Sequence, residues 1–527
     1  MKKNIGFWLS GFCLLNSFQL FAQSYPEEAL IFNRTNAGGS ARIQSMGGAQ
    51  VALGGDYSSA FSNPAGLGFY NRSEATLSLG TNFYGASSSY LGTTTNSSKA
   101  NFNVPGFSLV LHSDKQKGKR VGSTFAVTYT RINNFNQNVK YQGVNTANSM
   151  IDYFLAQCNA PIPNQPPAQL FDQNNPNSLY YTLPWLGYSN FLLGPKNELI
   201  YNGDSTQYHS YPLESWPGSI QQSEQIKTSG SQNQLNFAYS LNFDDFFYLG
   251  ASIGVPTINY QSNKTYTEYF PSGPLIGYEL DENLHVTGTG INATIGGIIK
   301  PKDFVQIGLS ISTPTYYPTL TEDYSATMSS GWDNYQYVDK TYSSHNTVLN
   351  GRRDSIYFQT PLLYSFSSPW RIKAGATFFI QKHGFITAEV ERVSYTNSSF
   401  GSNSNTPSDF SWDNTQIKTM FHSTFNYRVG GEYRFKDFRV RVGGNYMPDP
   451  YSTVQNGVNN AMMSYTCGFG YRAKKYFIDL AVVDTQWKSS YLPYSRGAIR
   501  YSDDNYSPIV TTKNSNVSAV VTVGFNL

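Results

Sequence analysis

The chain has 527 residues, of which 13% are charged and 16% are aromatic, and its formal net charge is +3. Soluble proteins usually carry charges at about a quarter of their residues, so this composition argues against an ordinary soluble enzyme. The nearly balanced charge gives no support to a nucleic-acid-binding protein.

The first 23 residues have the pattern of a targeting segment. Lys2 and Lys3 precede a mostly apolar stretch over residues 5–21, after which polar residues begin. This order is typical of a secretory signal peptide, so we predict one at residues 1–23, with cleavage near Ala22 or Gln23. No later apolar run reaches the roughly 20 residues that a membrane-spanning helix needs. The exported chain is therefore expected to be either soluble or a β-barrel.

Residues 24–73 differ from the rest of the chain. Residues 33–72 are dense in glycine, alanine and serine and end in the run Asn63-Pro64-Ala65-Gly66 followed by a short apolar stretch. The glycines make an isolated helix costly, and the segment lacks the alternation of a strand. Backbone with small side chains suits a confined space whose walls come from elsewhere. We therefore predict that residues 24–73 form a plug, or hatch, inside a structure built by residues 74–527.

Segments of about ten residues with alternating character recur from residue 74 to the end. In the last of them, one face carries Val517, Val521, Val523, Phe525 and Leu527. A soluble sandwich would also show one apolar and one polar face. Aromatic residues near strand ends, and a second face rich in glycine and charge, favour a transmembrane β-barrel whose polar face lines the lumen.

The connections between these segments support the same fold. We place strands at residues 74–84, 103–113, 123–133, 232–243, 246–260, 284–300, 304–312, 369–380, 384–395, 419–434, 437–447, 462–472, 476–485 and 515–527. Tight turns and long loops alternate between them, as in outer-membrane barrels, which have an even strand number. We predict an all-β fold, a transmembrane antiparallel barrel of about 14 strands. A hairpin hidden in residues 313–368 would change that count by two.

The longest predicted extracellular loop spans residues 134–231. Within it, residues 147–157 have apolar side chains at helical spacing and predict a short helix. Met150, Ile151, Phe154 and Leu155 would pack this loop onto the barrel rim, or they would line a ligand entrance.

The hatch carries a resemblance to a known family. Residues 39–56, followed by Asn63-Pro64-Ala65-Gly66-Leu67, resemble the N-terminal hatch of the outer-membrane long-chain fatty-acid and hydrocarbon transporters of the FadL/TodX type. Residues 307–314 and 369–375 are similar to recurring features of those barrels, and the style of the sequence resembles the Bacteroidetes branch. The chain departs from the pattern in ending at Leu527 rather than at an aromatic residue.

This resemblance implies a function and a site. It implies a barrel plugged by its N-terminal segment that passes hydrophobic small molecules by diffusion, with Asn63, Pro64, Ala65 and Gly66 as the hatch motif. We therefore expect a monomeric channel of the cell outer membrane, in contact with membrane lipid and lipopolysaccharide. An alternative is a barrel that serves as a binding or structural partner in a secretion or surface-attachment machine. A general porin would need an open lumen, which the hatch argues against.

Charged residues on the polar faces of the late strands form the next candidate site. They are Lys373, Glu389, Glu391, Arg428, Glu432, Arg439, Arg441 and Asp479. Opposite signs alternate between neighbouring strands, so cross-strand pairing would offset the cost of desolvation. We interpret them as ion pairs that fix the barrel and hold the hatch, with Asp56 of the hatch as a candidate partner of Arg439 or Arg441. A polar conduit, or a binding point for a ligand carboxylate, is the alternative.

Two further features complete the prediction. Pro105 and Gly106 lie at the outer end of the second strand, and proline cannot donate to a ladder, so they mark a place where the wall could open or simply a strand start. The six histidines show no metal-ligand spacing, so we predict no metal, no cofactor and no enzymatic activity. A hydrolase whose serine, histidine and acid lie far apart in sequence stays as a minor alternative. The two cysteines beyond the signal peptide do not predict a disulfide framework.

Overall fold

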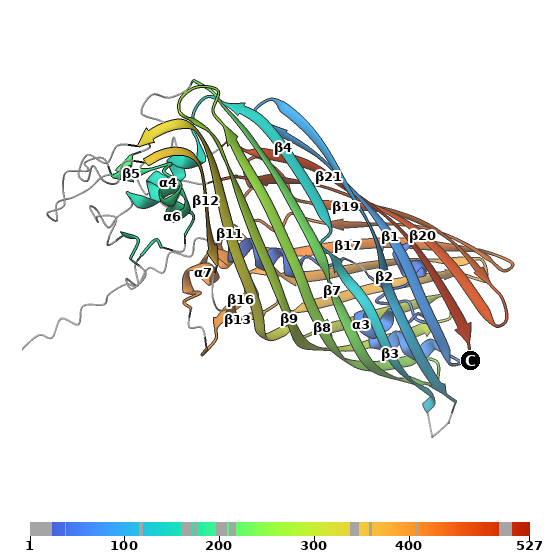
Figure 1. The fold of residues 1–527 in the computed structure, drawn as a ribbon. Helices are drawn as coiled ribbons and strands as arrows, with labels where there is room; N and C mark the ends of the chain where they lie inside the picture. Colours follow the sequence, from blue (N-terminus) through green and yellow to red (C-terminus); the bar gives the residue numbers. More distant parts are fainter. Residues whose placement is uncertain are drawn as a thin grey trace, which may run out of the picture.

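A ring of long antiparallel strands forms the body of the molecule (Figure 1). The computed structural model describes residues 24–36, 38–114, 120–159, 170–172, 178–180, 182–195, 208–209, 218–337, 347–357, 361–405, 408–494 and 508–527. The predicted signal peptide, residues 1–23, lies outside the described residues. So do parts of the predicted loop 134–231.

Fourteen strands close the ring. They are β1 (Glu74–Tyr90), β2 (Thr93–Ser113), β3 (Arg120–Asn134), β7 (Ile220–Phe243), β8 (Phe247–Tyr269), β9 (Leu275–Lys302), β10 (Val305–Ser312), β14 (Arg371–Ile380), β15 (Gly384–Ser394), β17 (Ser423–Phe435), β18 (Phe438–Met447), β19 (Met462–Arg472), β20 (Tyr476–Tyr491) and β21 (Val510–Asn526). Each pairs antiparallel with the next, and β21 pairs with β1 from Glu74↔Asn526 to Ser89↔Thr511. The predicted closed barrel of about 14 strands is thus confirmed.

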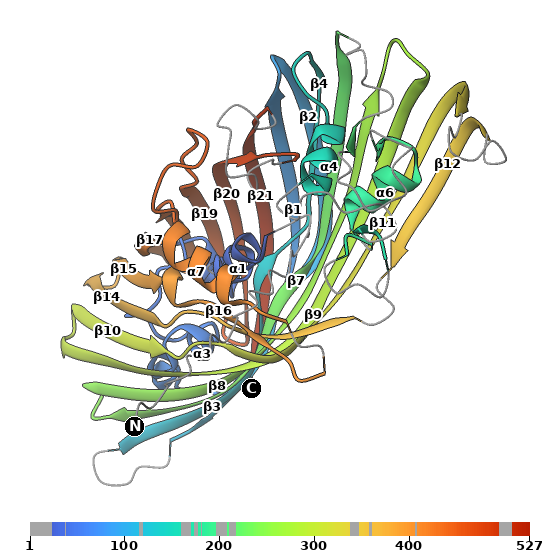
Figure 2. The same ribbon diagram turned by 90° about the vertical axis from the view of Figure 1, so that its left-hand side faces the viewer.

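The hairpin suspected in residues 313–368 exists, but it lies outside the ring. Strand β9 is long enough to pair with β10 at its C-terminal half and with β11 (Tyr316–Tyr337) at its N-terminal half. Strand β12 (Thr347–Tyr357) pairs with β11, and β4 (Gln137–Asn145) likewise continues the pairing of β7 beyond β3. These strands lengthen one side of the wall without adding to the closed ring (Figure 2).

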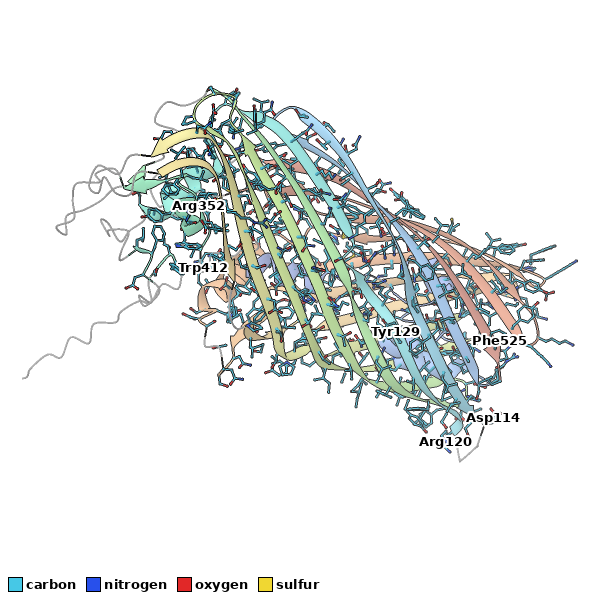
Figure 3. All side chains as sticks on the ribbon, viewed as in Figure 1. Asp114, Arg120, Tyr129, Arg352, Trp412 and Phe525 are labelled. Carbon is cyan, nitrogen blue, oxygen red and sulfur yellow. The ribbon has the colours of Figure 1, made fainter. Side chains whose placement is uncertain are left out.

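The two ends of the barrel differ. One end, which we call the turn end, carries tight turns near residues 244, 303, 382, 436 and 474, the start of β1 and the end of β21. The opposite loop end carries the long connections. Figure 3 shows Asp114, Arg120 and Phe525 at the turn end and Arg352 and Trp412 at the loop end. This is the alternation of short and long connections on which the barrel prediction was based.

The wall is apolar outside and polar inside. On β17 the outward side chains Phe425, Tyr427, Val429, Tyr433 and Phe435 are 48–60% exposed. The side chains between them, including Thr424, Asn426, Arg428 and Glu432, are buried in the lumen. Large exposed apolar side chains also cover the other ring strands toward the turn end. A wall of this kind needs apolar surroundings, because polar groups fill its interior and apolar groups its exterior.

Helices fill the concave side of the lengthened wall at the loop end. The predicted helix corresponds to α4 (Met150–Cys158), which packs beside α6 (Leu183–Ser189). Met150, Ile151 and Phe154 are buried in one apolar cluster with residues of α6 and the strands beneath. These residues therefore pack the loop onto the wall, the first of the two interpretations given above. Cys158 is buried and Cys467 is exposed, and both are free.

The remaining elements are short. They are β5 (Gly194–Pro195), β6 (Tyr208–His209), β13 (Leu362–Ser367), β16 (Ser399–Ser402), the 3-10 turn η3 (Tyr395–Asn397) and the helix α7 (Ser411–Met420). Across the described residues, every helix is too short or too polar to cross a membrane.

Candidate functional site: the hatch and the wall beside it

The N-terminal segment lies inside the barrel (Figures 1 and 2). It forms α1 (Tyr25–Asn33), α2 (Ala41–Gln44), α3 (Ser59–Ser62) and the 3-10 helix η1 (Pro64–Phe69). The helices after α1 have four to six residues each, and the glycines between α2 and α3 interrupt helix propagation there. A serine begins α2, where the Ser40 hydroxyl accepts a hydrogen bond from the Ile43 amide. These short elements fit together because the wall confines them.

Glycines of the wall receive the hatch. An added Cβ would come within 2.6 Å of a hatch atom at eight wall positions, a distance that real Cβ atoms do not reach. One of them is Gly106 on β2, where the hatch atom is the Tyr57 hydroxyl. We call the other seven the glycine belt: Gly250, Gly296, Gly308, Gly375, Gly430, Gly443 and Gly468. They lie on β8, β9, β10, β14, β17, β18 and β19. Backbone and side-chain atoms of the hatch thus take the place that wall side chains would otherwise fill.

The predicted hatch motif lies against this belt. Asn63 Nδ2 donates to the carbonyl oxygens of Val51, at 2.6 Å, and of Gly297 on β9, at 3.3 Å. Asn63 Oδ1 accepts from the Ala65 amide at 3.2 Å. A Cβ on Gly250 would come within 2.3 Å of Pro64. Asn63 therefore ties the turn both to the hatch itself and to the wall.

The lack of space around Gly66 explains why the last residue of the motif is a glycine. A Cβ there would lie 2.5 Å from the hydroxyl of Ser59, so a larger residue would separate η1 from α3. All four residues of the motif are buried. Their role in passage of a ligand stays a prediction.

The predicted ion pairs of Arg428 are present. Arg428 on β17 lies opposite Glu389 on β15, and its two terminal nitrogens donate to Glu389 at 2.5 Å and to Glu391 at 2.7 Å. The second oxygen of Glu389 accepts from the amides of Gln50 and Val51 in the hatch, each at 2.9 Å. Glu389 therefore joins the wall to the hatch as well as to Arg428.

The pairing of Asp56 with Arg439 or Arg441 is wrong. Asp56 accepts from the Ser40 hydroxyl at 2.6 Å and from the amide and hydroxyl of Ser58 at 3.0 and 2.7 Å. Arg441 instead donates to Glu432 and Asp479, both at 2.7 Å. Asp56 therefore has its partners within the hatch, and Arg441 has its partners within the wall. Asp56 is satisfied by hatch serines, and Arg441 by carboxylates on the adjacent strands.

Sequence reasoning missed the role of Arg42, one of the cations of the hatch. Arg42 Nε lies 3.8 Å from the Glu432 carboxylate, the one ion pair between hatch and wall that the described residues show. Wall cations reach the hatch by hydrogen bonds instead: Arg371 donates to the Asn33 carbonyl, and Lys373 to the Ser62 hydroxyl at 3.3 Å. Arg42 is the one cation in residues 35–71, and this position was the signal that could have shown its contact with the wall.

Glu389→Gln is expected to lower the stability of the hatch. It removes a charge that binds two hatch amides and Arg428, and loss of one partner of a buried ion pair costs about 3–5 kcal/mol. Thermal unfolding in detergent and hydrogen exchange of residues 41–69 would measure the change. Glu279→Gln, at an exposed position of β9, is the control. An equal effect of both substitutions would contradict this role.

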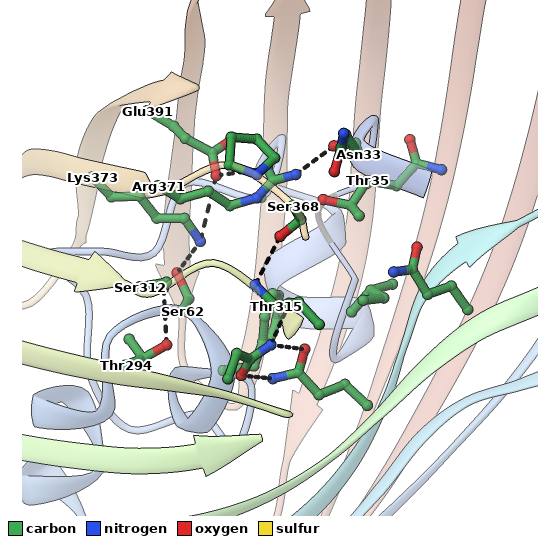
Figure 4. Close-up of a pocket in the computed structure, with 18 of the residues that line it drawn as sticks. Asn33, Thr35, Ser62, Thr294, Ser312, Thr315, Ser368, Arg371, Lys373 and Glu391 are labelled. Atoms are coloured by element: carbon green, nitrogen blue, oxygen red, sulfur yellow. Dashed lines mark hydrogen bonds and ion pairs between the residues drawn. The ribbon is translucent and has the colours of Figure 1, made fainter. Parts of the chain in front are cut away.

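A small cavity lies between α1 and the hatch turn. Its volume is about 70 Å³, and its lining is mostly polar, with Ser62, Thr294, Arg371, Lys373 and Glu391 among the residues drawn in Figure 4. The cations and Glu391 face one another here, with Arg371 Nη1 3.3 Å and Lys373 Nζ 3.9 Å from that carboxylate. The cavity is therefore suited to a polar group rather than to a purely apolar ligand.

The wall is interrupted between β2 and β3. The ladder between them runs from Ser113↔Ser123 to Gly106↔Thr130 and stops there. On β2 the next residue is Pro105, which has no amide hydrogen to donate. A bulge places Val104 and Pro105 opposite the single residue Leu79 of β1. We call the stretch formed by residues 102–105 and 131–133 the window.

Contacts close the window at both ends. On its turn-end side, Phe107 stacks on Tyr129 with ring centroids 5.1 Å apart, and Tyr129 is labelled in Figure 3. On its loop-end side, Asn134 Nδ2 donates to Asn101 Oδ1 at 3.4 Å. Strand β3 is also irregular here, since its pairing with β7 shifts between Arg131 and Asn133.

The hatch lies directly behind the window. The Asn36 amide donates to the carbonyl of Ile132, the residue skipped by the shift, at 2.9 Å. A cavity of about 100 Å³ is lined by the window residues Asn103 and Pro105 and by Gly47 and Gly48 of the hatch. Pro105, predicted as a wall opening, thus lies where the ladder ends, and Gly106 forms its last pair.

Two buried carboxylates hold α1, and they lie outside the ring strands. Tyr364 donates to Glu28 at 2.6 Å, and Tyr25 donates to Glu322 of β11 at 3.4 Å. Burial raises the pKa of Glu322 to about 7. Burial and the neighbouring Glu322 charge raise the pKa of Glu28 well above its ordinary value.

The docking of α1 is therefore expected to weaken as the pH rises. The free carboxyl has a pKa near 4.3, so the penalty for ionisation begins above about pH 4 and is complete above the folded value of about 7. Hydrogen exchange of α1, corrected for intrinsic rates, should show falling protection between pH 5 and 8. The double variant Glu28→Gln/Glu322→Gln should lose this dependence, and an unchanged profile would contradict the assignment.

Comparison with known proteins gives a fold match. No protein-family model matches the sequence, and no curated protein matches it. Among solved structures, a FadL homologue from Pseudomonas aeruginosa is 11% identical, covering 93% of this chain and 98% of that chain, with a TM-score of 0.52.

Two toluene transporters give lower scores over a similar span. They are TbuX from Ralstonia pickettii (14% identical, 93% of this chain and 99% of that chain, TM-score 0.48) and TodX from P. putida (12%, 93% and 99%, 0.49). The fold likeness rests on the first structure. The chain therefore has the fold of the FadL homologue, as the resemblance of its hatch residues predicts.

Proposed function

We propose that the protein is an outer-membrane channel that passes hydrophobic small molecules sideways through the window. One observation carries the proposal: the hatch fills the lumen against the glycine belt, while beside it residues 102–105 of β2 have no pairing with β3. A ligand that enters from the loop end meets the hatch, and the gap at the window offers an exit into the apolar surroundings of the wall.

The apolar exterior supports a location in the outer membrane, with the turn end in the periplasm. A signal peptide at residues 1–23 would export the chain. The ring closes on one chain, so a monomer suffices, and its exposed face would contact membrane lipid and lipopolysaccharide. The names of the FadL homologue and of the toluene transporters fit fatty acids or hydrocarbons as the ligand class, and passage needs no energy source if it follows the concentration gradient.

Mass spectrometry of lipid extracts tests this function. The protein is purified from its native membrane in neutral detergent without added ligand, and extracts are compared with those of an unrelated barrel prepared in parallel. We expect an apolar molecule enriched with this protein, and slower uptake of that molecule by a deletion strain. Finding neither would contradict the channel.

One observation favours a second function. The cavity beside α1 and the cavity behind the window have mostly polar linings and volumes of about 70 and 100 Å³, whereas long strands extend the wall at the loop end (Figure 2). A binding partner in a secretion or surface-attachment machine would use the surface of that extended wall and need no apolar cavity. Normal uptake in a deletion strain that loses secretion or attachment would support this alternative.

A further inference from the structure

A cavity larger than the two described above opens on the turn side of the hatch, away from the window and the loop end. Its volume is about 720 Å³, and it lies between the hatch, the start of β1 and the turn-end parts of β17 to β21. Six cationic side chains line it: Arg42, Arg72, Arg434, Arg439, Arg472 and Lys474. Three acidic side chains line it as well: Asp56, Glu74 and Glu432.

The acidic groups of this cavity already have hydrogen-bond or ion-pair partners within the protein. Asp56 accepts hydrogen bonds from Ser40 and Ser58, and Glu74 accepts one from Tyr70 at 3.0 Å. Glu432 lies beside three guanidinium groups, with Arg434 and Arg441 each at 2.7 Å and Arg42 at 3.8 Å.

The cationic groups are in excess. Arg472 shares Asp479 with the buried Arg441, at 2.8 and 2.7 Å, so two carboxylates serve four guanidinium groups. One nitrogen of Arg472 is buried without a hydrogen-bond partner. Several guanidinium groups therefore lie together with too few anions to balance them.

Arg439 is held by backbone carbonyls rather than by a carboxylate. Its Nη1 donates to the carbonyls of Lys436 and Phe438 in its own turn, at 2.7 and 2.8 Å. Among the residues that the structure describes, no carboxylate lies within ion-pair distance of it. Its side chain is half-buried and lines the cavity. A guanidinium held this way can donate to an incoming anion in a fork geometry.

Aromatic side chains supply the apolar part of the lining. Phe69, Tyr70 and Phe477 border the cavity, and the Arg472 guanidinium lies over the Phe477 ring at 4.3 Å. A cationic, concave surface with aromatic neighbours fits a small organic anion better than an inorganic cation or a neutral solute.

We propose that the turn-end cavity is a binding site for an oxyanion, the carboxylate or phosphate of a small amphiphile, held by Arg439 and Arg472. The site goes beyond the proposed channel function, because it lies on the other side of the hatch from the window. Two sources can supply this chemistry, a carboxylate on an alkyl chain or a phosphate group. The phenyl and guanidinium groups together favour the first.

Isothermal titration of the full-length protein in neutral detergent tests this site with octanoate and, separately, with inorganic phosphate. We expect saturable binding of octanoate at one site per chain, weakened by added salt. Arg439→Gln should raise its dissociation constant about tenfold, which corresponds to about 1.4 kcal/mol. If phosphate binds and octanoate does not, the site takes a phosphate group. Octanol serves as the uncharged probe and should not bind there.

Two further variants separate binding from folding. Arg352→Gln, at the loop end (Figure 3), is the matched control and should bind octanoate like the natural protein. Arg472→Gln should also weaken binding, and the heat-dependent gel shift of the barrel reports whether it still folds. Absence of saturable binding of either anion, or equal binding by Arg439→Gln and the natural protein, would overturn the proposal. Neither outcome bears on uptake through the window.

Discussion

Gly430→Ala is expected to displace the hatch from the wall. The new Cβ would lie 2.5 Å from both the Cβ and the carbonyl oxygen of Met46. Both neighbours belong to a packed hatch that the other belt glycines hold in place, so relaxation at one position is resisted along the whole belt. Overpacking of this kind typically costs about 1–3 kcal/mol. Faster hydrogen exchange over residues 41–69 would show the displacement, and ion conductance in planar bilayers would show a partly opened lumen.

The neighbouring glycine provides the control. A Cβ on Gly431 would meet the Phe385 carbonyl at 3.4 Å and an Ile386 methylene at 3.9 Å, which are ordinary contacts. Gly431→Ala makes the same chemical change one residue along the strand, on the outward face. Hatch protection and conductance should stay as in the natural protein. Equal hatch protection and conductance in the two variants would contradict the role of the glycine belt in holding the hatch.

Asn103→Trp is expected to abolish uptake through the window while leaving the barrel folded. Asn103 is 8% exposed and lines the cavity of about 100 Å³ behind the window. An indole ring would fill that cavity, so a ligand could not pass between the hatch and the wall. Uptake by cells that carry the variant should fall to the level of the deletion strain. The gel shift of the folded barrel, measured on the same membranes, should be unchanged.

Val104→Trp is the control, because it adds the same side chain on the outer side of the wall instead of the inner side. Val104 precedes Pro105 in the same bulge, but its side chain is 37% exposed on the outer surface. A tryptophan there adds the same bulk on the side that faces the surroundings, where aromatic residues are tolerated. Uptake should stay close to normal. Normal uptake by Asn103→Trp would show that ligands leave by another route, and the window would then carry no transport function.

Much of the fold follows from the sequence, because a strand with one apolar and one polar face shows this alternation residue by residue. The segment 515–527 predicted a strand with Val517, Val521 and Phe525 on its outer face, and these side chains are exposed on β21. Tight turns predicted the pairing of neighbours, and the alternation of short and long connections with an even strand number predicted a closed barrel. The small residues of the hatch likewise predicted backbone packed in a confined space, since such residues cannot form a core of their own.

Other features depended on which strands come to lie side by side, and no local pattern reports that. The residues 316–357 have strand character but extend β9 outside the ring, because β10 ends before β9 does. Charge alone predicts Arg439 or Arg441 as the partner of Asp56, yet hatch serines bind Asp56 and carboxylates of neighbouring strands bind Arg441.

The sequence by itself determined the alternating wall, the number of strands within two and the presence of a plug, since each depends on spacing along the chain. The tertiary structure decided where that plug is held. The belt glycines are separated by up to about two hundred residues, and only closure of the barrel brings their bare backbone to one level around the hatch. It also decided the site of the window, because a gap in a ladder exists only when both strands are in place.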